Sequence, residues 1–85
     1  MYWIHEQDKK YYRARVACDL TGQLGVSKEF GSLKTARARR MFTPVSSRFA
    51  GAEELDKVNR DRIRHGYRVT LDPLEQLLKA ESLNQ

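Results

Sequence analysis

The sequence predicts an α+β domain in which an antiparallel sheet of about four to five strands packs against one main helix, followed by a short C-terminal helix. Apolar and polar residues alternate in successive segments between residues 2 and 42, as in strands with one buried face. Short connections rich in Gly, Ser and Asp join these segments, which is typical of hairpins. After Pro44 the apolar spacing changes to that of a helix.

The composition describes one small folded domain. The chain has 85 residues, 40% hydrophobic and 32% charged, which is enough for one thin core and too apolar for a disordered segment. It contains no apolar run of membrane-spanning length and does not begin like a signal peptide, so we expect no membrane association and a cytoplasmic location. The single cysteine, Cys18, fits that reducing compartment. We expect residues 1–71 to form the main domain and residues 72–85 a short helix and tail.

The strands are predicted from their alternation. Tyr2-Trp3-Ile4-His5 is β-prone and is expected as an edge strand. The clearest strand ends at the turn Asp19-Leu20-Thr21-Gly22, and Cys18 on its apolar face is expected to be a small buried hydrophobe. Lys28 interrupts the apolar face of the following strand. The apolar positions of these two strands are Tyr12, Ala14, Val16, Cys18 and Leu20, then Leu24, Val26 and Phe30.

The helices are predicted from spacing and end signals. Ser46 or Ser47 can cap a helix over residues 48–65, and Gly66 is a typical left-handed stop. The stripe expected to face the core is Phe49, Ala52, Leu55, Val58 or Asn59, and Ile63. Residues 67–71 alternate like a returning strand, and Asp72-Pro73 opens a short helix through Glu81 that places three leucines on one side, Leu74, Leu77 and Leu78.

One segment carries the charge excess of the chain. Residues 30–52 contain no acid, and their five cations equal the net charge of +5; they are Lys34, Arg37, Arg39, Arg40 and Arg48. Residues 35–42 alternate like a strand with Arg37 and Arg39 on one side, an arrangement that suits a polyanion. The alternative is a solvated face that keeps a small protein soluble. Lys10, Arg13 and Arg15 extend the basic face only if their strand lies beside residues 35–42.

Several of these pieces together resemble the WGR domain, a family named for a Trp-Gly-Arg signature and found beside poly(ADP-ribose) polymerase catalytic domains and in small bacterial proteins. The resemblance covers about residues 9–69. The matching pieces, in order, are Lys10-Tyr11-Tyr12, the turn Asp19-Leu20-Thr21-Gly22, Glu29-Phe30-Gly31-Ser32-Leu33, Met41-Phe42, the helix with Ala52, and Arg64-His65-Gly66-Tyr67.

The resemblance implies a sheet packed against one principal helix and a contact with DNA ends, in which the Trp stacks and the Arg meets the backbone. Here Phe30 stands at the Trp position, Gly31 is kept, and Ser32 replaces the Arg. Phe30 can still stack on a sugar or base. Ser32 supplies no charge, so Lys34, Arg37 or Arg39 would have to replace the lost Arg.

The sequence therefore predicts a non-enzymatic module that binds nucleic acid, DNA first and RNA second. Phe30 would stack, and Gly31 would mark a bulge or a close backbone approach. Lys34, Arg37, Arg39 and Arg40 would hold phosphates. With four or five phosphates engaged, a fourfold rise in salt would weaken binding by about two to three powers of ten.

A second hypothesis is a protein-interaction module or homodimer that uses Trp3, Tyr11 and the helix with Leu74, Leu77 and Leu78. An acidic protein partner is a third. We expect no catalysis, because the sequence has no glycine-rich phosphate loop and no nucleophile in a recognisable setting. His5, His65 and Cys18 form no recognisable metal set, so no metal or cofactor is expected.

Overall fold

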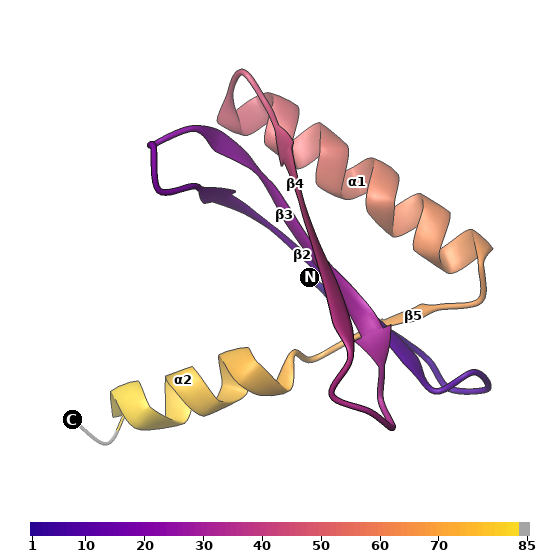
Figure 1. Cartoon of the computed structure of the whole chain (residues 1–85). Helices are drawn as coiled ribbons and strands as arrows, with labels where there is room; N and C mark the ends of the chain where they lie inside the picture. Colours follow the sequence, from indigo (N-terminus) through magenta and orange to yellow (C-terminus); the bar gives the residue numbers. More distant parts are fainter. Residues whose placement is uncertain (84–85) are drawn as a thin grey trace.

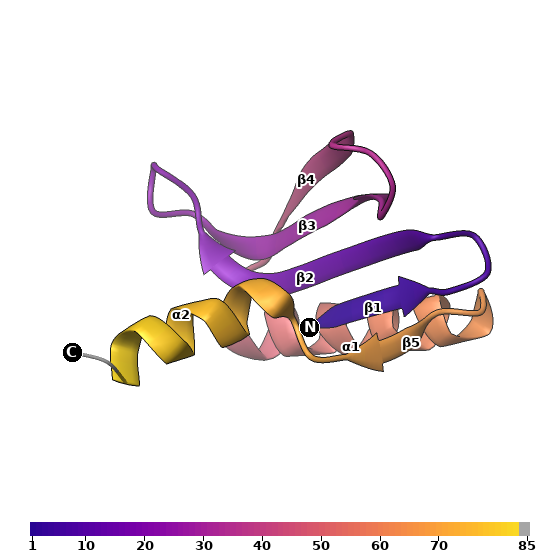
Figure 2. The ribbon, with the colours of Figure 1, turned by 90° about the horizontal axis from the view of Figure 1, so that it is seen from below.

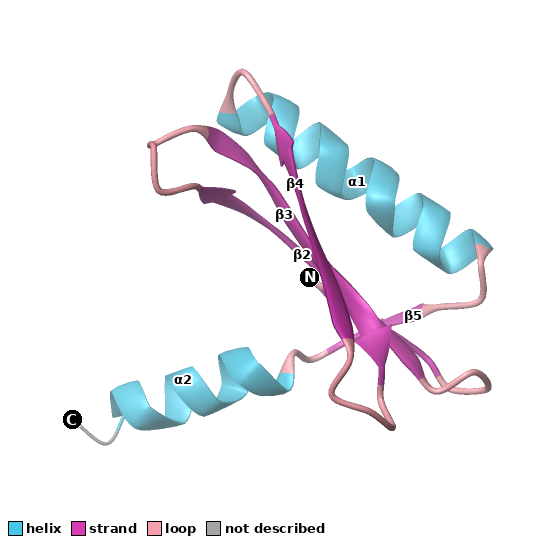
Figure 3. Cartoon of the chain, in the orientation of Figure 1, coloured by secondary structure: helices cyan, strands magenta, loops and turns pink. Residues whose placement is uncertain are grey.

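The computed structural model describes residues 1–83, with side chains described through residue 80. Its elements are β1 (Tyr2–His5), β2 (Lys10–Cys18), β3 (Leu24–Ser32), β4 (Ala38–Pro44), α1 (Arg48–Arg64), β5 (Arg68–Thr70) and α2 (Pro73–Leu83). The strands form one five-stranded antiparallel sheet in the order β4-β3-β2-β1-β5 (Figures 1 and 3). The predicted fold class is confirmed.

Strand β1 is not the edge strand that the sequence predicted. It pairs with β2 on one side and with β5 on the other, so that Trp3 lies between Tyr12 and Val69. The prediction was wrong because pairing with the short returning strand after α1 depends on residues more than sixty positions away. The two edges of the sheet are β4 and β5.

The core lies between α1 and one face of the sheet (Figure 2). Trp3, Ala14 and Val26 have no exposed surface, and Val58 of α1 closes over them. The indole Nε1 of Trp3 donates a hydrogen bond of 2.9 Å to the Oδ1 of Asn59 on α1. The one polar atom of this large side chain is thereby satisfied, as burial requires.

The face of α1 that meets the sheet differs from the predicted stripe. Phe49 is 75% exposed and Ile63 is 54% exposed, whereas Gly51 and Val58 are buried. A Cβ added to Gly51 would lie 3.0 Å from Cγ2 of Val16 on β2, so the absence of a side chain lets the helix approach closely. This contact fixes the rotation of the helix and turns Phe49 and Ile63 away from the core.

The predicted ends of α1 are confirmed. Ser47 is the N-cap, and its Oγ accepts a hydrogen bond of 3.0 Å from the amide of Ala50. Gly66 has φ of +89°, the left-handed conformation expected after a helix, and the Tyr67 amide then donates to the Arg62 carbonyl at 2.9 Å. Both signals involve only residues close in sequence.

The turn after β2 also has the predicted chemistry. The Oδ1 of Asp19 accepts from the amides of Thr21 and Gln23, each at 2.9 Å. Cys18 and Leu20 are exposed, however, so the prediction that Cys18 is buried was wrong. The reason is that the β2–β3 turn extends beyond the area that α1 covers (Figure 1).

Helix α2 extends to one side of the sheet (Figure 1), and Leu74 and Leu78 line a hollow together with Arg13 of β2. Three of its leucines are about half exposed: Leu74 by 51%, Leu77 by 59% and Leu78 by 56%. Among the residues described, no helix combines the length and apolarity needed to cross a membrane.

Candidate nucleic-acid interface

The β3–β4 hairpin differs from the predicted strand over residues 35–42. Strand β4 begins at Ala38, so Arg37 lies in the connecting loop rather than on the strand. Two short-range hydrogen bonds hold this loop: the Lys34 amide donates to the Ser32 Oγ at 3.0 Å, and the Arg37 amide donates to the Thr35 Oγ1 at 3.3 Å. Ser and Thr hydroxyls compete in this way with strand pairing, which explains why the alternation of residues 35–37 does not produce a strand.

Gly31 allows a close backbone approach, one of the two roles predicted for it. A Cβ added at this position would lie too close to the carbonyl oxygen of Arg37 and 3.1 Å from the Cα of Ala38. The absence of a side chain therefore lets the loop fold back over the end of β3. Gly31 shapes the hairpin, whether or not a ligand also contacts it.

The hairpin brings together most of the predicted site. One shallow hollow is lined by Phe30, Gly31, Ser32, Thr35, Ala36, Arg37, Ala38 and Arg39. Lys34 is exposed on the same loop. Among the described residues, no carboxylate lies within ion-pair distance of Lys34, Arg37 or Arg39. These three cations are therefore free to meet an anion.

Arg40 does not belong to this group. Consecutive strand residues point to opposite faces, so Arg40 lies on the face opposite to Arg39. Its Nη2 lies 3.4 Å from the Oε1 of Glu29, its register partner on β3. The four predicted cations consequently do not form one row, because Arg40 lies on the other face of the sheet and is paired with Glu29.

The ring of Phe30 is held by a second aromatic ring that sequence reasoning did not connect with the site. Phe30 stacks on Tyr12 of β2 with ring centroids 5.5 Å apart and ring planes inclined by 7°. The Arg62 guanidinium lies 4.7 Å from the centroid of the Tyr12 ring. The alternation in the sequence places Tyr12 and Phe30 each on the apolar face of its strand. Only the register of β2 and β3, which pairs the two residues directly, shows that their rings touch.

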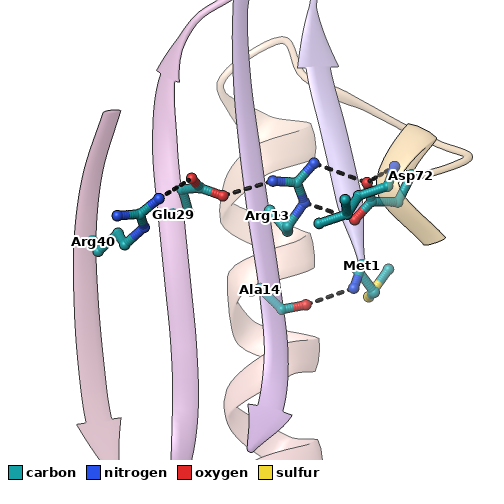
Figure 4. A network of polar contacts seen from close by, with 7 residues as sticks. Met1, Arg13, Ala14, Glu29, Arg40 and Asp72 are labelled. Atoms are coloured by element: carbon teal, nitrogen blue, oxygen red, sulfur yellow. Dashed lines mark hydrogen bonds and ion pairs between the residues drawn. The ribbon is translucent and has the colours of Figure 1, made fainter. Parts of the chain in front are cut away.

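On the face opposite α1, two arginines meet acids (Figure 4), whereas Arg15 on the same face has no ion pair among the described residues. Arg13 donates from Nε to the Oδ2 of Asp72 at 2.7 Å, from Nη2 to the Oδ1 of Asp72 at 2.8 Å and from Nη1 to Glu29 at 2.6 Å. Glu29 also meets Arg40, so the network crosses the sheet from β4 to the start of α2. Strand β3 separates β2 from β4, so the predicted condition for a wider basic face is not met. Arg13 and Arg15 lie on the face opposite to Arg39, whereas Lys10 lies on the face of Phe30.

The protonation of this network follows from its geometry. The hydrogen bond to Asp72 raises the pKa of Arg13, against burial, which lowers it. Burial raises the pKa of Asp72, but hydrogen bonds from Arg13 and from the Leu74 amide outweigh that effect, so its pKa lies below the ordinary value of 3.8. Both groups are charged at neutral pH, and the network is a fixed part of the fold.

Trp3 does not belong to the predicted protein interface. Its exposed fraction is 0%, so no partner can reach it in this fold. The other predicted interface residues, Leu74, Leu77 and Leu78, are accessible on α2.

Fold and site together define a small α+β domain with a basic hairpin in which three cations have no acidic partner among the described residues. Comparison of the chain with models of protein families, with curated proteins and with solved structures finds no match.

Proposed function

We propose that the chain is a non-enzymatic WGR-like module that binds nucleic acid, DNA in the first place, through its β3–β4 hairpin. One observation carries the proposal: the Phe30 ring lines the same hollow as Arg37 and Arg39, and Lys34 is exposed on the loop of this hairpin. None of these three cations has a carboxylate partner among the described residues. Stacking platforms combined with free cations are typical of surfaces that bind single-stranded nucleic acid.

In this arrangement Lys34, Arg37 and Arg39 contact phosphates, and each contact releases condensed counterions. A base or sugar stacks on the face of Phe30 that Tyr12 leaves free. The phosphate contacts carry no sequence information, so recognition is weakly sequence-selective. The opposite face of the sheet is less suited to a polyanion, because Arg13 and Arg40 already meet acids there.

The proposed WGR relationship assigns Phe30-Gly31-Ser32 to the signature position. The hydroxyl of Ser32 accepts a hydrogen bond from Lys34, so this residue has a role in the loop that an Arg would not fulfil in the same way. Arg37 and Arg39 line the same hollow and can supply the charge that Ser32 lacks.

The test is a titration of labelled duplex, nicked, overhanging and single-stranded DNA at two salt concentrations. The double variant Arg37→Ala, Arg39→Ala should lose at least about tenfold in affinity. The matched control is Arg60→Ala, Arg64→Ala, which removes the same charge from α1 and should change affinity by less than about threefold. Equal losses in the two double variants would mean that only net charge matters, and the hairpin site would be abandoned.

Homodimerisation through α2 is a second candidate, favoured by the half exposure of Leu74, Leu77 and Leu78 on a helix that extends to one side of the sheet. Sedimentation equilibrium should then give a dimer for the native chain and a monomer for Leu77→Asp. The control is Leu20→Asp in the β2–β3 turn, which adds the same charge at a fully exposed leucine. A monomeric native chain at high concentration would reject this candidate.

A further inference from the structure

The outer edge of β4 has a defined hydrogen-bonding pattern. The amide of Val45 donates to the carbonyl of Leu24 at 3.0 Å, which marks these two residues as a hydrogen-bonded pair just beyond the end of β4. In antiparallel strands such pairs alternate with non-bonded pairs. Counting along the register, Arg39, Met41 and Thr43 direct their backbone groups towards β3.

The alternate residues of β4 direct their backbone N–H and C=O groups outward; they are Ala38, Arg40 and Phe42. In the part of the chain that the structure describes, no strand pairs with this edge. Pro44, which has no N–H, ends the row. The edge is therefore a short template of alternating donors and acceptors for one more strand.

The side chains at this edge are basic on both faces of the sheet. Arg39 lies on the face of Phe30 and Arg40 on the opposite face, and Arg40 is 81% exposed. The chain has no acid between residues 30 and 52. Glu29, on the neighbouring strand, contacts Arg40 at 3.4 Å but is shared with Arg13, which it meets at 2.6 Å. The charge of the edge is thus only partly compensated.

This charge pattern selects among strands that could join the edge. A second copy of β4 would bring its own Arg39 and Arg40 next to those of the first, and like charges in neighbouring positions of paired strands are destabilising. A strand with two consecutive acidic residues would instead place one carboxylate near Arg40 on one face and the other near Arg39 on the other face.

We propose that β4 accepts an extended acidic segment of a partner protein as a sixth strand of the sheet. The outward backbone groups of Ala38, Arg40 and Phe42 hydrogen-bond the segment, and Arg39 and Arg40 select for adjacent acids. The proposed nucleic-acid site lies at the tip of the same hairpin and shares Arg39 with this edge, but it makes no use of the strand backbone.

The first test uses a short labelled peptide of threonine and valine with a central pair of glutamates. A peptide with two lysines in place of the glutamates should bind at least about tenfold more weakly. In an added strand every second amide faces β4, so N-methylation of one alternate set of amides should abolish binding, while methylation of the other set should change it by less than about threefold. Equal effects of the two sets, or equal binding of the two charge types, would overturn the proposal.

The second test changes the protein. Ala38→Pro removes one outward donor at the first residue of an edge strand, where proline is tolerated, and should weaken peptide binding by about fivefold. Ala38→Val keeps the donor and should bind like the native chain. If both variants bind the peptide equally well, the backbone edge is not used and the proposal is wrong.

The third test measures amide hydrogen exchange in the native chain, so its result does not depend on whether a variant folds. In the native chain the amides of Arg40 and Phe42 should exchange rapidly with solvent, and those of Arg39 and Met41 slowly, because only the latter two donate to β3. Saturating peptide should slow the exchange at Arg40 and Phe42. If exchange at these two amides does not change, the bound peptide lies elsewhere and the proposal is wrong. If single-stranded DNA then also displaces the peptide, the peptide binds at the hairpin tip instead.

Discussion

Phe30 of β3 and Tyr12 of β2 stack nearly parallel, with their ring planes inclined by 7° and their centroids 5.5 Å apart. Tyr12 has two further neighbours. It packs edge-to-face with Trp3, with ring centroids 5.8 Å apart, and the guanidinium of Arg62 lies 4.7 Å from the centroid of its ring. The Phe30 ring is therefore held in place before any ligand arrives, and only one of its faces is available. Such preorganisation lowers the entropic cost of binding.

Replacement of Phe30 tests the stacking role. Phe30→Ala should weaken binding of single-stranded DNA by about 1–3 kcal/mol, the usual contribution of stacking one base. Phe30→Tyr preserves the ring and should bind within about threefold of the native chain. Affinity is measured by fluorescence anisotropy, with thermal unfolding as a control for folding. Unaltered affinity in Phe30→Ala would leave the ring a purely structural role.

The salt dependence of binding reports how many phosphates are engaged. The structure leaves three cations at the hairpin rather than the four or five phosphate contacts that the sequence suggested, because Arg40 lies on the other face. Three contacts on duplex DNA should weaken binding by about fortyfold for a fourfold rise in salt. A loss of several hundredfold would mean that cations outside the hairpin contribute, and no loss would reject phosphate contacts.

The Arg13–Asp72 pair should make stability depend on acid pH. The folded-state pKa of Asp72 is below its ordinary value of 3.8, so the pair stabilises the fold fully above that value and loses its effect as pH falls through the lower folded-state pKa. Asp72→Asn should cost about 1–3 kcal/mol at neutral pH. Urea unfolding over a pH series should show this difference shrinking below the ordinary carboxyl pKa. A difference that stays constant with pH would contradict the assignment.

Gly51 should resist substitution although it lies inside a helix. Gly51→Leu raises helix propensity by up to about 1 kcal/mol, but overpacking against Val16 costs typically about 1–3 kcal/mol, so a net loss of stability is expected. Ala52→Leu places the same side chain one residue further on, at an exposed position, and should be nearly neutral. Chemical unfolding monitored by the single tryptophan would measure both. Higher stability in Gly51→Leu would show that the helix is not closely packed there.

Much of the fold could be predicted from the sequence, because the relevant signals are local. The turn at Asp19, the cap at Ser47 and the stop at Gly66 each act through hydrogen bonds or backbone conformation within four residues. Alternation and helical spacing then identified the strands, the helices and the fold class. For the candidate site, the basic hairpin and an unusual backbone role for Gly31 could be predicted in the same way, but the pairing of Arg40 with Glu29 could not.

Only the tertiary structure decided how these elements meet. The internal position of β1 and the rotation of α1 by the Gly51–Val16 contact depend on residues far apart in the chain, and Arg13 and Asp72, which form the polar network, are 59 positions apart. Periodicity gives each element a buried face, but it contains no information on which element covers that face. The sequence by itself therefore determined the elements and their ends, and packing decided which side chains are buried, which cations are neutralised and which edge of the sheet stays open.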